Sequence, residues 1–298
     1  MEIKELPTEQ RNPASMRIDQ MTAAEIVKTI NDADQTVAEA VKRASGPLAE
    51  AIDQAADHYR RGGRLIYMGA GSSGRLGVLD AVELVPTYGI SPDRAVGLLA
   101  GGLGAMFKAV EGAEDRADLG QKDLQDLKLK QDDVVIGLAA SGRTPYVLGG
   151  LDYASQVGAL TIAVACVSGS LIGQHAQIAI EAVTGPEVIT GSTRMKAGTA
   201  QKMILNALST GIMIKQGKVY QNVMIAVKPT NQKLVDRAIR IIMTVADVDQ
   251  DAAGAALAKS KSDVPAAVVM LKRGCGLAEA AQLLKKHHGN VADVIKLR

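Results

Sequence analysis

Short apolar runs alternate with longer amphipathic stretches through the middle of the chain. The apolar runs have the length of buried strands and cover residues 64–68, 95–100, 133–139, 160–166 and 178–182. The amphipathic stretches have helical periodicity and include residues 75–85, 107–117 and 144–156. Strands that alternate with helices indicate a parallel sheet covered by helices on both faces. The pattern therefore predicts a doubly wound parallel α/β fold.

The region before the first apolar run is predicted to be helical. Thr22 is followed three residues later by Glu25, which is the pattern of a capping box at a helix start. Helical periodicity then continues to about residue 61, with a break expected near Gly46 and Pro47. The glycine pair at 62–63 ends this region, which we interpret as a helical N-terminal arm.

The end of the chain is also predicted to be helical. One long helix is expected over residues 195–215, and another is expected to open at Pro229 and reach about residue 245. Short alanine-rich helical pieces follow at residues 249–258, 264–271 and 277–286. We expect three parts, namely the helical N-terminal arm (1–62), the α/β domain (63–246) and a small helical C-terminal subdomain (247–298).

Composition and charge exclude several classes of function. A net charge of +2 gives no basic footprint for nucleic acid, and an aromatic content of 2% argues against stacking on bases. No apolar run reaches membrane-spanning length, and the N-terminal residues have no signal-peptide core. The two cysteines and four histidines have no spacing typical of metal ligands. We therefore expect a cytoplasmic protein without metal, cofactor, nucleic-acid or membrane partners.

A glycine-rich turn follows the first predicted strand at residues 69–74. Gly71 lets a ligand approach the backbone, and the Ser72 and Ser73 hydroxyls, together with free amides at the helix start, can hold a phosphate. An ordinary tight strand–helix turn remains an alternative. A dinucleotide site is less favoured because the next strand ends in Gly101 and Gly102 and not in an acidic residue.

A second hydroxyl-rich turn, residues 140–145, follows the third predicted strand. Ser141 and Thr144 offer hydroxyls, although either residue could instead cap the following helix. The carboxyl ends of parallel strands meet at one edge of a sheet, so both turns should face the same crevice. Together they favour a phosphorylated small molecule as ligand.

Polar residues also gather at 185–199, ahead of the long predicted helix. Ser192 or Thr193 could cap this helix, and Arg194 and Lys196 could neutralise an anionic ligand. The alternative is a capped helix whose basic residues are solvent-exposed.

Two glutamates are candidates for acid–base chemistry. Glu83 lies between apolar neighbours, a setting that favours the protonated form of a carboxyl and so a general acid. Glu114 follows the glycine pair at 101–102. For either residue, a solvated helix face or a salt bridge is the alternative.

Taken together, these segments resemble the N-acetylmuramic acid 6-phosphate etherase family. Residues 68–89 are similar to that family's signature, and further segments match in the same order at residues 8–13, 109–115, 141–145 and 191–202. Ser72 stands where the family more often has Thr, Leu84-Val85 where Cys-Pro is usual, and Tyr88 where Phe is usual. These departures remove no carboxylate and no turn glycine, so they bear on substrate preference and not on the reaction.

The resemblance implies a sugar-isomerase-type domain in a homodimer that removes D-lactate from N-acetylmuramic acid 6-phosphate, giving N-acetylglucosamine 6-phosphate. It places the two acidic active-site positions on Glu83 and Glu114. It implies phosphate and sugar contacts from Gly71, Ser72, Ser73, Ser141, Arg143, Thr144, Ser192, Thr193 and Lys196. A sugar-phosphate isomerase and a sugar-phosphate-binding regulatory protein remain alternatives on the same fold.

Overall fold

The computed structural model describes residues 7–227, 229 and 231–297, and its centre is a five-stranded parallel sheet. The strands are β1 (Leu65–Gly69), β2 (Ala95–Leu99), β3 (Val134–Leu138), β4 (Leu160–Ala165) and β5 (Ile178–Glu181). Each strand lies on one of the predicted apolar runs, and their order in the sheet is β2-β1-β3-β4-β5. The doubly wound parallel fold is thereby confirmed.

The sheet has its topological switch point between β1 and β3. The chain leaves β1 for β2 on one side and returns to pair β3 with β1 on the other, with Leu65 opposite Val134 and Gly69 opposite Leu138. In sheets of this kind, ligands bind outside the carboxyl ends of the strands at the switch point. The two hydroxyl-rich turns follow β1 and β3 and therefore flank that position.

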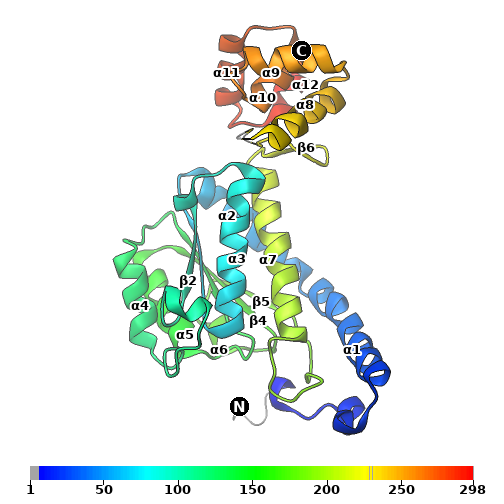
Figure 1. Ribbon diagram of the computed structural model, residues 1–298. Helices are drawn as coiled ribbons and strands as arrows, with labels where there is room; N and C mark the ends of the chain where they lie inside the picture. Colours follow the sequence, from blue (N-terminus) through cyan, green and yellow to red (C-terminus); the bar gives the residue numbers. More distant parts are fainter. Residues whose placement is uncertain (1–6, 228, 230, 298) are drawn as a thin grey trace. The chain divides into compact units, whose positions relative to one another are not determined.

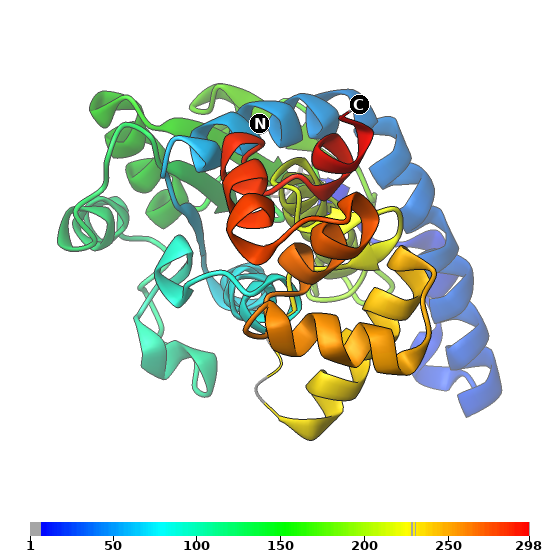
Figure 2. The same ribbon diagram turned by 90° about the horizontal axis from the view of Figure 1, so that it is seen from above.

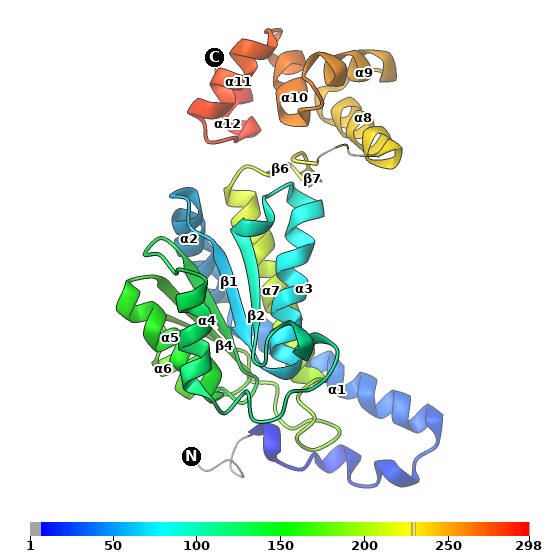
Figure 3. The same ribbon diagram turned by 60° about the vertical axis from the view of Figure 1, so that its left-hand side comes forward.

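Helices cover both faces of the sheet (Figure 1, Figure 3). On one face lie α4 (Ala117–Asp126), α5 (Pro145–Val157) and α6 (Leu171–Gln174), and on the other lie α3 (Gly71–Tyr88) and α7 (Lys196–Lys215). Successive side chains of β1 point to opposite faces. A Cβ added at Gly77 of α3 would lie 2.8 Å from Tyr67 Cβ, and one at Gly150 of α5 would lie 2.0 Å from Met68 Cε. Both helices therefore use glycine to pack tightly on the strand.

The N-terminal arm contains α1 (Ala23–Arg43) and α2 (Ser45–Arg60), and from residue 7 onward these are preceded by the short 3₁₀ turns η2 (Pro7–Glu9), η3 (Pro13–Ser15) and η4 (Ile18–Gln20). The predicted capping box is confirmed, because Thr22 and Glu25 exchange hydrogen bonds at the start of α1. The helix break falls at Ala44, just ahead of the predicted position. The η3 turn is tied to the loop before α7, since the Ser15 hydroxyl donates to the Val188 carbonyl over 2.7 Å.

The helix predicted over residues 107–117 is wrong. The chain there forms the short 3₁₀ turn η6 (Leu103–Met106) and further turns, and Gly112 has a φ of +72° that an α-helix does not allow. The next helix, α4, begins only at Ala117. The apolar residues of this segment are largely exposed, and Phe107 is 96% exposed. Their spacing therefore did not mark a core-facing helix.

Contacts among the described residues define two compact units, which we call the N-terminal unit (up to Val82, with Pro92–Ser209) and the C-terminal unit (Glu83–Ser91, with Thr210 onward). The C-terminal unit holds the helices α8 (Gln232–Ala246), α9 (Gln250–Lys259), α10 (Val264–Arg273), α11 (Leu277–Lys286) and α12 (Val291–Lys296) (Figure 2). It also holds a small hairpin of β6 (Val219–Tyr220) and β7 (Val223–Met224).

The helices of the C-terminal unit share an apolar core. Ile242 of α8, Val268 of α10 and Val294 of α12 are all buried within it. The domain boundary between residues 246 and 247 stays a prediction from the sequence. The C-terminal unit defined by contacts begins earlier in the chain and includes α8. The hairpin and α12 were not predicted, because both are too short to show a period. None of the described helices is long and apolar enough to span a membrane.

Candidate active site

The two hydroxyl-rich turns lie next to each other at the carboxyl ends of β1 and β3. A Cβ added at Gly69, the last residue of β1, would lie 2.9 Å from the Leu138 carbonyl oxygen, the last of β3. A Cβ at Gly74 would lie 2.4 Å from the Gly69 carbonyl oxygen. Only glycine fits at these contacts, so the first turn folds back closely over the end of its own strand.

The first turn presents backbone amides and hydroxyls at the start of α3. Gly71, with a φ of +51°, is the first residue of the helix, so Ser72 and Ser73 belong to the first turn, whose N–H groups have no helical acceptor. Such amides and the helix dipole attract a phosphate. Ser72 is half-buried, whereas Ser73 is buried and its hydroxyl donates to Oε1 of Gln201 on α7 over 2.9 Å.

The second turn presents the hydroxyls of Ser141 and Thr144 at the start of α5. Gly142 has a φ of +71°, and a Cβ there would lie 2.4 Å from Ser170 Cβ, so the turn requires glycine. Thr144 occupies the N-cap position of α5, but its side chain makes no capping hydrogen bond. The capping alternative is therefore wrong for the Thr144 side chain. Its hydroxyl and that of half-buried Ser141 can bind a ligand.

A cavity of about 560 Å³ brings together four of the predicted site residues, namely Glu114, Ser141, Arg143 and Thr144. Glu114 is exposed and lies in the loop before α4. Its backbone is held at the start of α5, because the Tyr146 N–H donates to the Glu114 carbonyl over 3.0 Å. Carboxylates, two hydroxyls and the Arg143 guanidinium therefore line one cavity beside the second turn, which suits a polar small molecule.

The cavity also contains two carboxylates that the sequence analysis gave no role, those of Glu9 and Asp115. Glu9 lines it beside Glu114, and Glu9 Oε2 lies 3.2 Å from the position of a Cβ added at Gly191. The η2 turn therefore brings Glu9 from the chain start to the cavity. The sequence did contain an indication that Glu9 has a role, because the segment 8–13 carried part of the family resemblance.

The structure corrects the predicted setting of Glu83. The side chain is exposed on α3, and Glu83 is not among the residues that line the cavity. Neighbours in sequence point to different sides of a helix, so the apolar residues beside Glu83 do not surround it. The buried carboxyl of this helix is Asp80, which accepts a hydrogen bond from Ser209 over 3.3 Å. Burial raises the pKa of Asp80.

The segment before α7 also differs from its prediction. The helix is capped by buried Glu187, whose carboxylate accepts hydrogen bonds of 2.9 Å from the backbone N–H groups of Lys196 and Ala197. The expectation that Ser192 or Thr193 caps α7 is therefore wrong. Both lie half-buried in the turns that lead to the helix.

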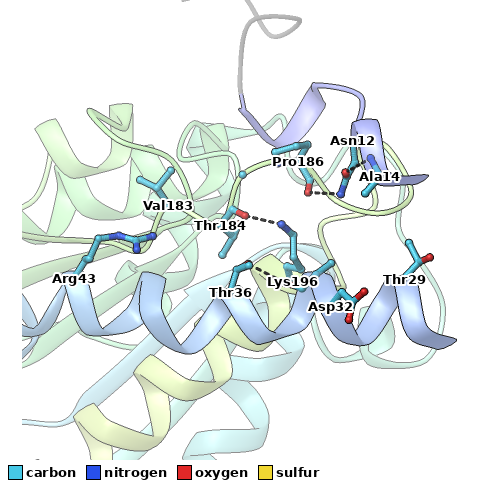
Figure 4. A pocket seen from close by; sticks show the side chains of 12 residues that line it. Asn12, Ala14, Thr29, Asp32, Thr36, Arg43, Val183, Thr184, Pro186 and Lys196 are labelled. Atoms are coloured by element: carbon cyan, nitrogen blue, oxygen red, sulfur yellow. Dashed lines mark hydrogen bonds between the residues drawn. The ribbon is translucent and has the colours of Figure 1, made fainter. Parts of the chain in front are cut away.

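Lys196 is buried at the start of α7 and not exposed on its surface. Its Nζ donates to the Thr184 carbonyl over 2.6 Å (Figure 4). Burial lowers the pKa of Lys196, while Glu187 and Asp34 oppose this effect. Lys196 lines a different cavity, of about 660 Å³, between the N-terminal arm and the loop after β5 (Figure 4). The structure therefore does not bring Lys196 into the cavity of Glu114.

Comparisons with known proteins match both the fold and the full length of the chain. Residues 47–155 match the glucokinase regulatory protein N-terminal SIS domain, and residues 114–211 match the SIS domain. The N-acetylmuramic acid 6-phosphate etherase of Lactobacillus gasseri is 66% identical over 99% of both chains. The protein of the same name from Lactobacillus acidophilus is 63% identical over 99% of both chains. A phosphoheptose isomerase structure from Francisella tularensis is 20% identical with a TM-score of 0.48, covering 65% of this chain and 100% of its own.

Proposed function

The chain belongs to the N-acetylmuramic acid 6-phosphate etherase family, and we propose that it cleaves the D-lactyl ether of N-acetylmuramic acid 6-phosphate. The products are N-acetylglucosamine 6-phosphate and D-lactate. The observation that carries this function is the 66% identity to a named etherase over nearly the whole chain. The cavity at the switch point supports it, since a carboxylate and a hydroxyl-rich turn line the same space.

The reaction is an elimination followed by hydration. An alkyl ether is a poor electrophile, so direct attack by water is slow. In the open-chain sugar the C1 aldehyde acidifies the hydrogen at C2, and a base removes it while the ether oxygen at C3 leaves as lactate. Water then adds at C3 of the unsaturated aldehyde, and C2 regains a proton. This scheme requires a base, an acid and hydrogen-bond donors for the enolate oxygen.

We assign the base to Glu114 and the acid to Glu83. Glu114 faces the cavity beside Ser141 and Thr144, which supports its contact with a bound sugar. Glu83 would protonate the C3 oxygen as lactate departs, because two carboxyls in different environments can divide the roles of acid and base. Because Glu83 is exposed, its function as an acid depends on the environment that a bound substrate creates.

The phosphate is assigned to the two turns at the switch point. The amides and hydroxyls of Ser72 and Ser73, beside Gly71, and the hydroxyls of Ser141 and Thr144 supply the hydrogen bonds, and Arg143 lies as a cation in the cavity of Ser141 and Thr144. Ser192 and Thr193, in the turns before α7, are proposed to contact the sugar, and buried Lys196 is proposed to support that contact from the start of α7.

The protein is further proposed to be a cytoplasmic homodimer. The first half of α1 is mostly exposed and carries apolar residues, and Val27 is 58% exposed. A helix with such a face gains stability when a second subunit covers it. The cytoplasmic assignment follows from the substrate, because a phosphorylated sugar is too polar to cross a membrane unaided.

The test of the function is an assay of free D-lactate after incubation with N-acetylmuramic acid 6-phosphate. An etherase releases lactate in a time-dependent manner. A sugar-phosphate isomerase would convert the sugar and leave the ether intact. A regulatory protein would bind the sugar phosphate without turnover. Release of lactate by the wild-type protein and its loss in Glu114→Gln would support the proposal, and binding without release would overturn it.

A further inference from the structure

Helices α3 and α7 are joined by a buried hydrogen bond at the first hydroxyl-rich turn, residues 69–74. The Ser73 hydroxyl donates to Gln201 Oε1 over 2.9 Å, and the two residues are 8% and 0% exposed. At the other end of the same amide, Gln201 Nε2 is buried and has no hydrogen-bond partner. An unpaired buried N–H is unusual in a folded protein and calls for an explanation.

This arrangement conflicts with phosphate binding by the Ser73 side chain. A serine hydroxyl has a single proton to donate. A phosphate ester at neutral pH is mainly an acceptor of hydrogen bonds. While Ser73 donates its proton to Gln201, the hydroxyl has none left for the phosphate.

A half-turn of the Gln201 amide removes the conflict. The two ends of a side-chain amide have nearly the same size, so the turn exchanges oxygen and nitrogen without moving other atoms. Nε2 then donates to Ser73 Oγ over the same 2.9 Å, and the Ser73 proton can point to the phosphate. One N–H of the amide is then paired, and a carbonyl oxygen takes the buried position of the unpaired nitrogen, where a group without a partner is less rare than an N–H.

We propose that Gln201 positions the Ser73 hydroxyl for binding of the phosphate. Its amide donates to the Ser73 hydroxyl and thereby directs the Ser73 proton to the ligand. The inference rests on the proposed function for the identity of the phosphate ester. It adds a residue on α7 that does not touch the substrate and to which no role has been assigned above. Because the phosphate is remote from the bonds that break, Gln201 should affect KM and leave kcat nearly unchanged.

The test is a double-mutant cycle on KM for N-acetylmuramic acid 6-phosphate, followed by release of D-lactate. Gln201→Met keeps the side-chain length and removes the amide, and it should raise KM about fivefold, the effect of one hydrogen bond. In a Ser73→Ala background the same change should have no further effect, because Gln201 acts only through the Ser73 hydroxyl. Equal effects of Gln201→Met in both backgrounds would assign Gln201 to packing and overturn the inference.

A second variant and a matched control complete the experiment. Gln201→Glu keeps the shape but offers only an acceptor, which holds the Ser73 proton and repels the phosphate, so its KM should exceed that of Gln201→Met. A wild-type KM for Gln201→Glu would overturn the inference. Ser209→Ala removes a different hydrogen bond between α3 and α7, the one to Asp80, and should lower stability without raising KM. A wild-type protein that releases no lactate would instead refute the proposed function itself.

Discussion

The backbone N–H of Tyr146 donates a hydrogen bond of 3.0 Å to the carbonyl oxygen of Glu114. Tyr146 directly follows the turn that carries Ser141 and Thr144, so this bond fixes the candidate base next to the candidate phosphate turn. The same tyrosine is anchored by its side chain, since its hydroxyl donates to Asp123 of α4 over 2.6 Å. The two hydrogen bonds of Tyr146 therefore connect α5 both to α4 and to the loop that carries Glu114.

Replacing Tyr146 by Phe separates these two connections. The variant loses the partly buried hydrogen bond to Asp123 but keeps the backbone N–H that holds Glu114. We expect the free energy of unfolding to fall by about 1–3 kcal/mol, with KM and kcat nearly unchanged at temperatures where the protein is folded. Urea unfolding and lactate kinetics measure the two quantities. A large loss of kcat in a folded variant would show that the side-chain bond also positions Glu114.

Removing the hydroxyl of Ser141 should weaken recognition of the phosphate. A hydrogen bond to a charged oxygen contributes about 1.5–3 kcal/mol, so Ser141→Ala should weaken binding of N-acetylglucosamine 6-phosphate at least about tenfold. Titration calorimetry measures this affinity. Ser155→Ala, an exposed position near the other end of α5, is the matched control and should bind like the wild type. Unchanged binding by Ser141→Ala would remove this residue from the site.

The buried carboxyl of Asp80 should make stability depend on pH. Burial raises its pKa in the folded protein above the ordinary value of 3.8, and the nearby Tyr67 and Ser209 hydroxyls only partly oppose this. The folded state therefore holds this proton more tightly, and the free energy of unfolding falls as pH rises from about 4 through the raised pKa. Asp80→Asn removes the titrating carboxyl and with it this pH dependence. The stability of the variant relative to wild type should therefore improve as pH rises from about 4 to 7. Urea unfolding across that range measures the difference in free energy of unfolding between the variant and wild type. A difference that did not vary with pH would contradict a raised pKa for Asp80.

The strands were predictable because each one is buried and apolar in a short, bounded run. The five apolar runs all became strands, and the alternation with helices was enough to predict the parallel sheet. The position of the two hydroxyl-rich turns followed from the same reasoning. What could not be predicted is that β1 and β3 are neighbours, because strand order depends on packing across the sheet and not on a local pattern.

The failures came from contacts between residues that are distant in sequence or on another helix face. Glu187 caps α7 from nine residues before its first turn, so no local capping pattern revealed it. Glu83 was judged by its neighbours in sequence, whereas the helix buries Leu84 and leaves both Glu83 and the adjacent Val82 exposed. Gln201 looked like an ordinary helical residue until the fold placed it against Ser73.

The proposed elimination leaves two isotopic marks on the product. If C2 is deprotonated and water later adds at C3, product formed in heavy water carries deuterium at C2. Product formed in oxygen-18 water carries the label in its C3 hydroxyl, because the original ether oxygen departs with lactate. Mass spectrometry and NMR of N-acetylglucosamine 6-phosphate and lactate measure both marks. Label in lactate, without deuterium at C2, would indicate displacement at the lactate carbon and refute the elimination.

Variants of the two glutamates then assign the base and the acid. Glu114→Gln should abolish exchange of the C2 hydrogen with solvent, because the amide cannot accept that proton, and lactate release should stop with it. Glu83→Gln should still allow slow exchange at C2 while blocking release, since only the proton for the departing oxygen is lost. Both variants keep the size of the side chain, and comparison of their melting curves with wild type controls for folding. If exchange stopped in Glu83→Gln and persisted in Glu114→Gln, the two roles would be exchanged, because the residue required for exchange at C2 is by definition the base.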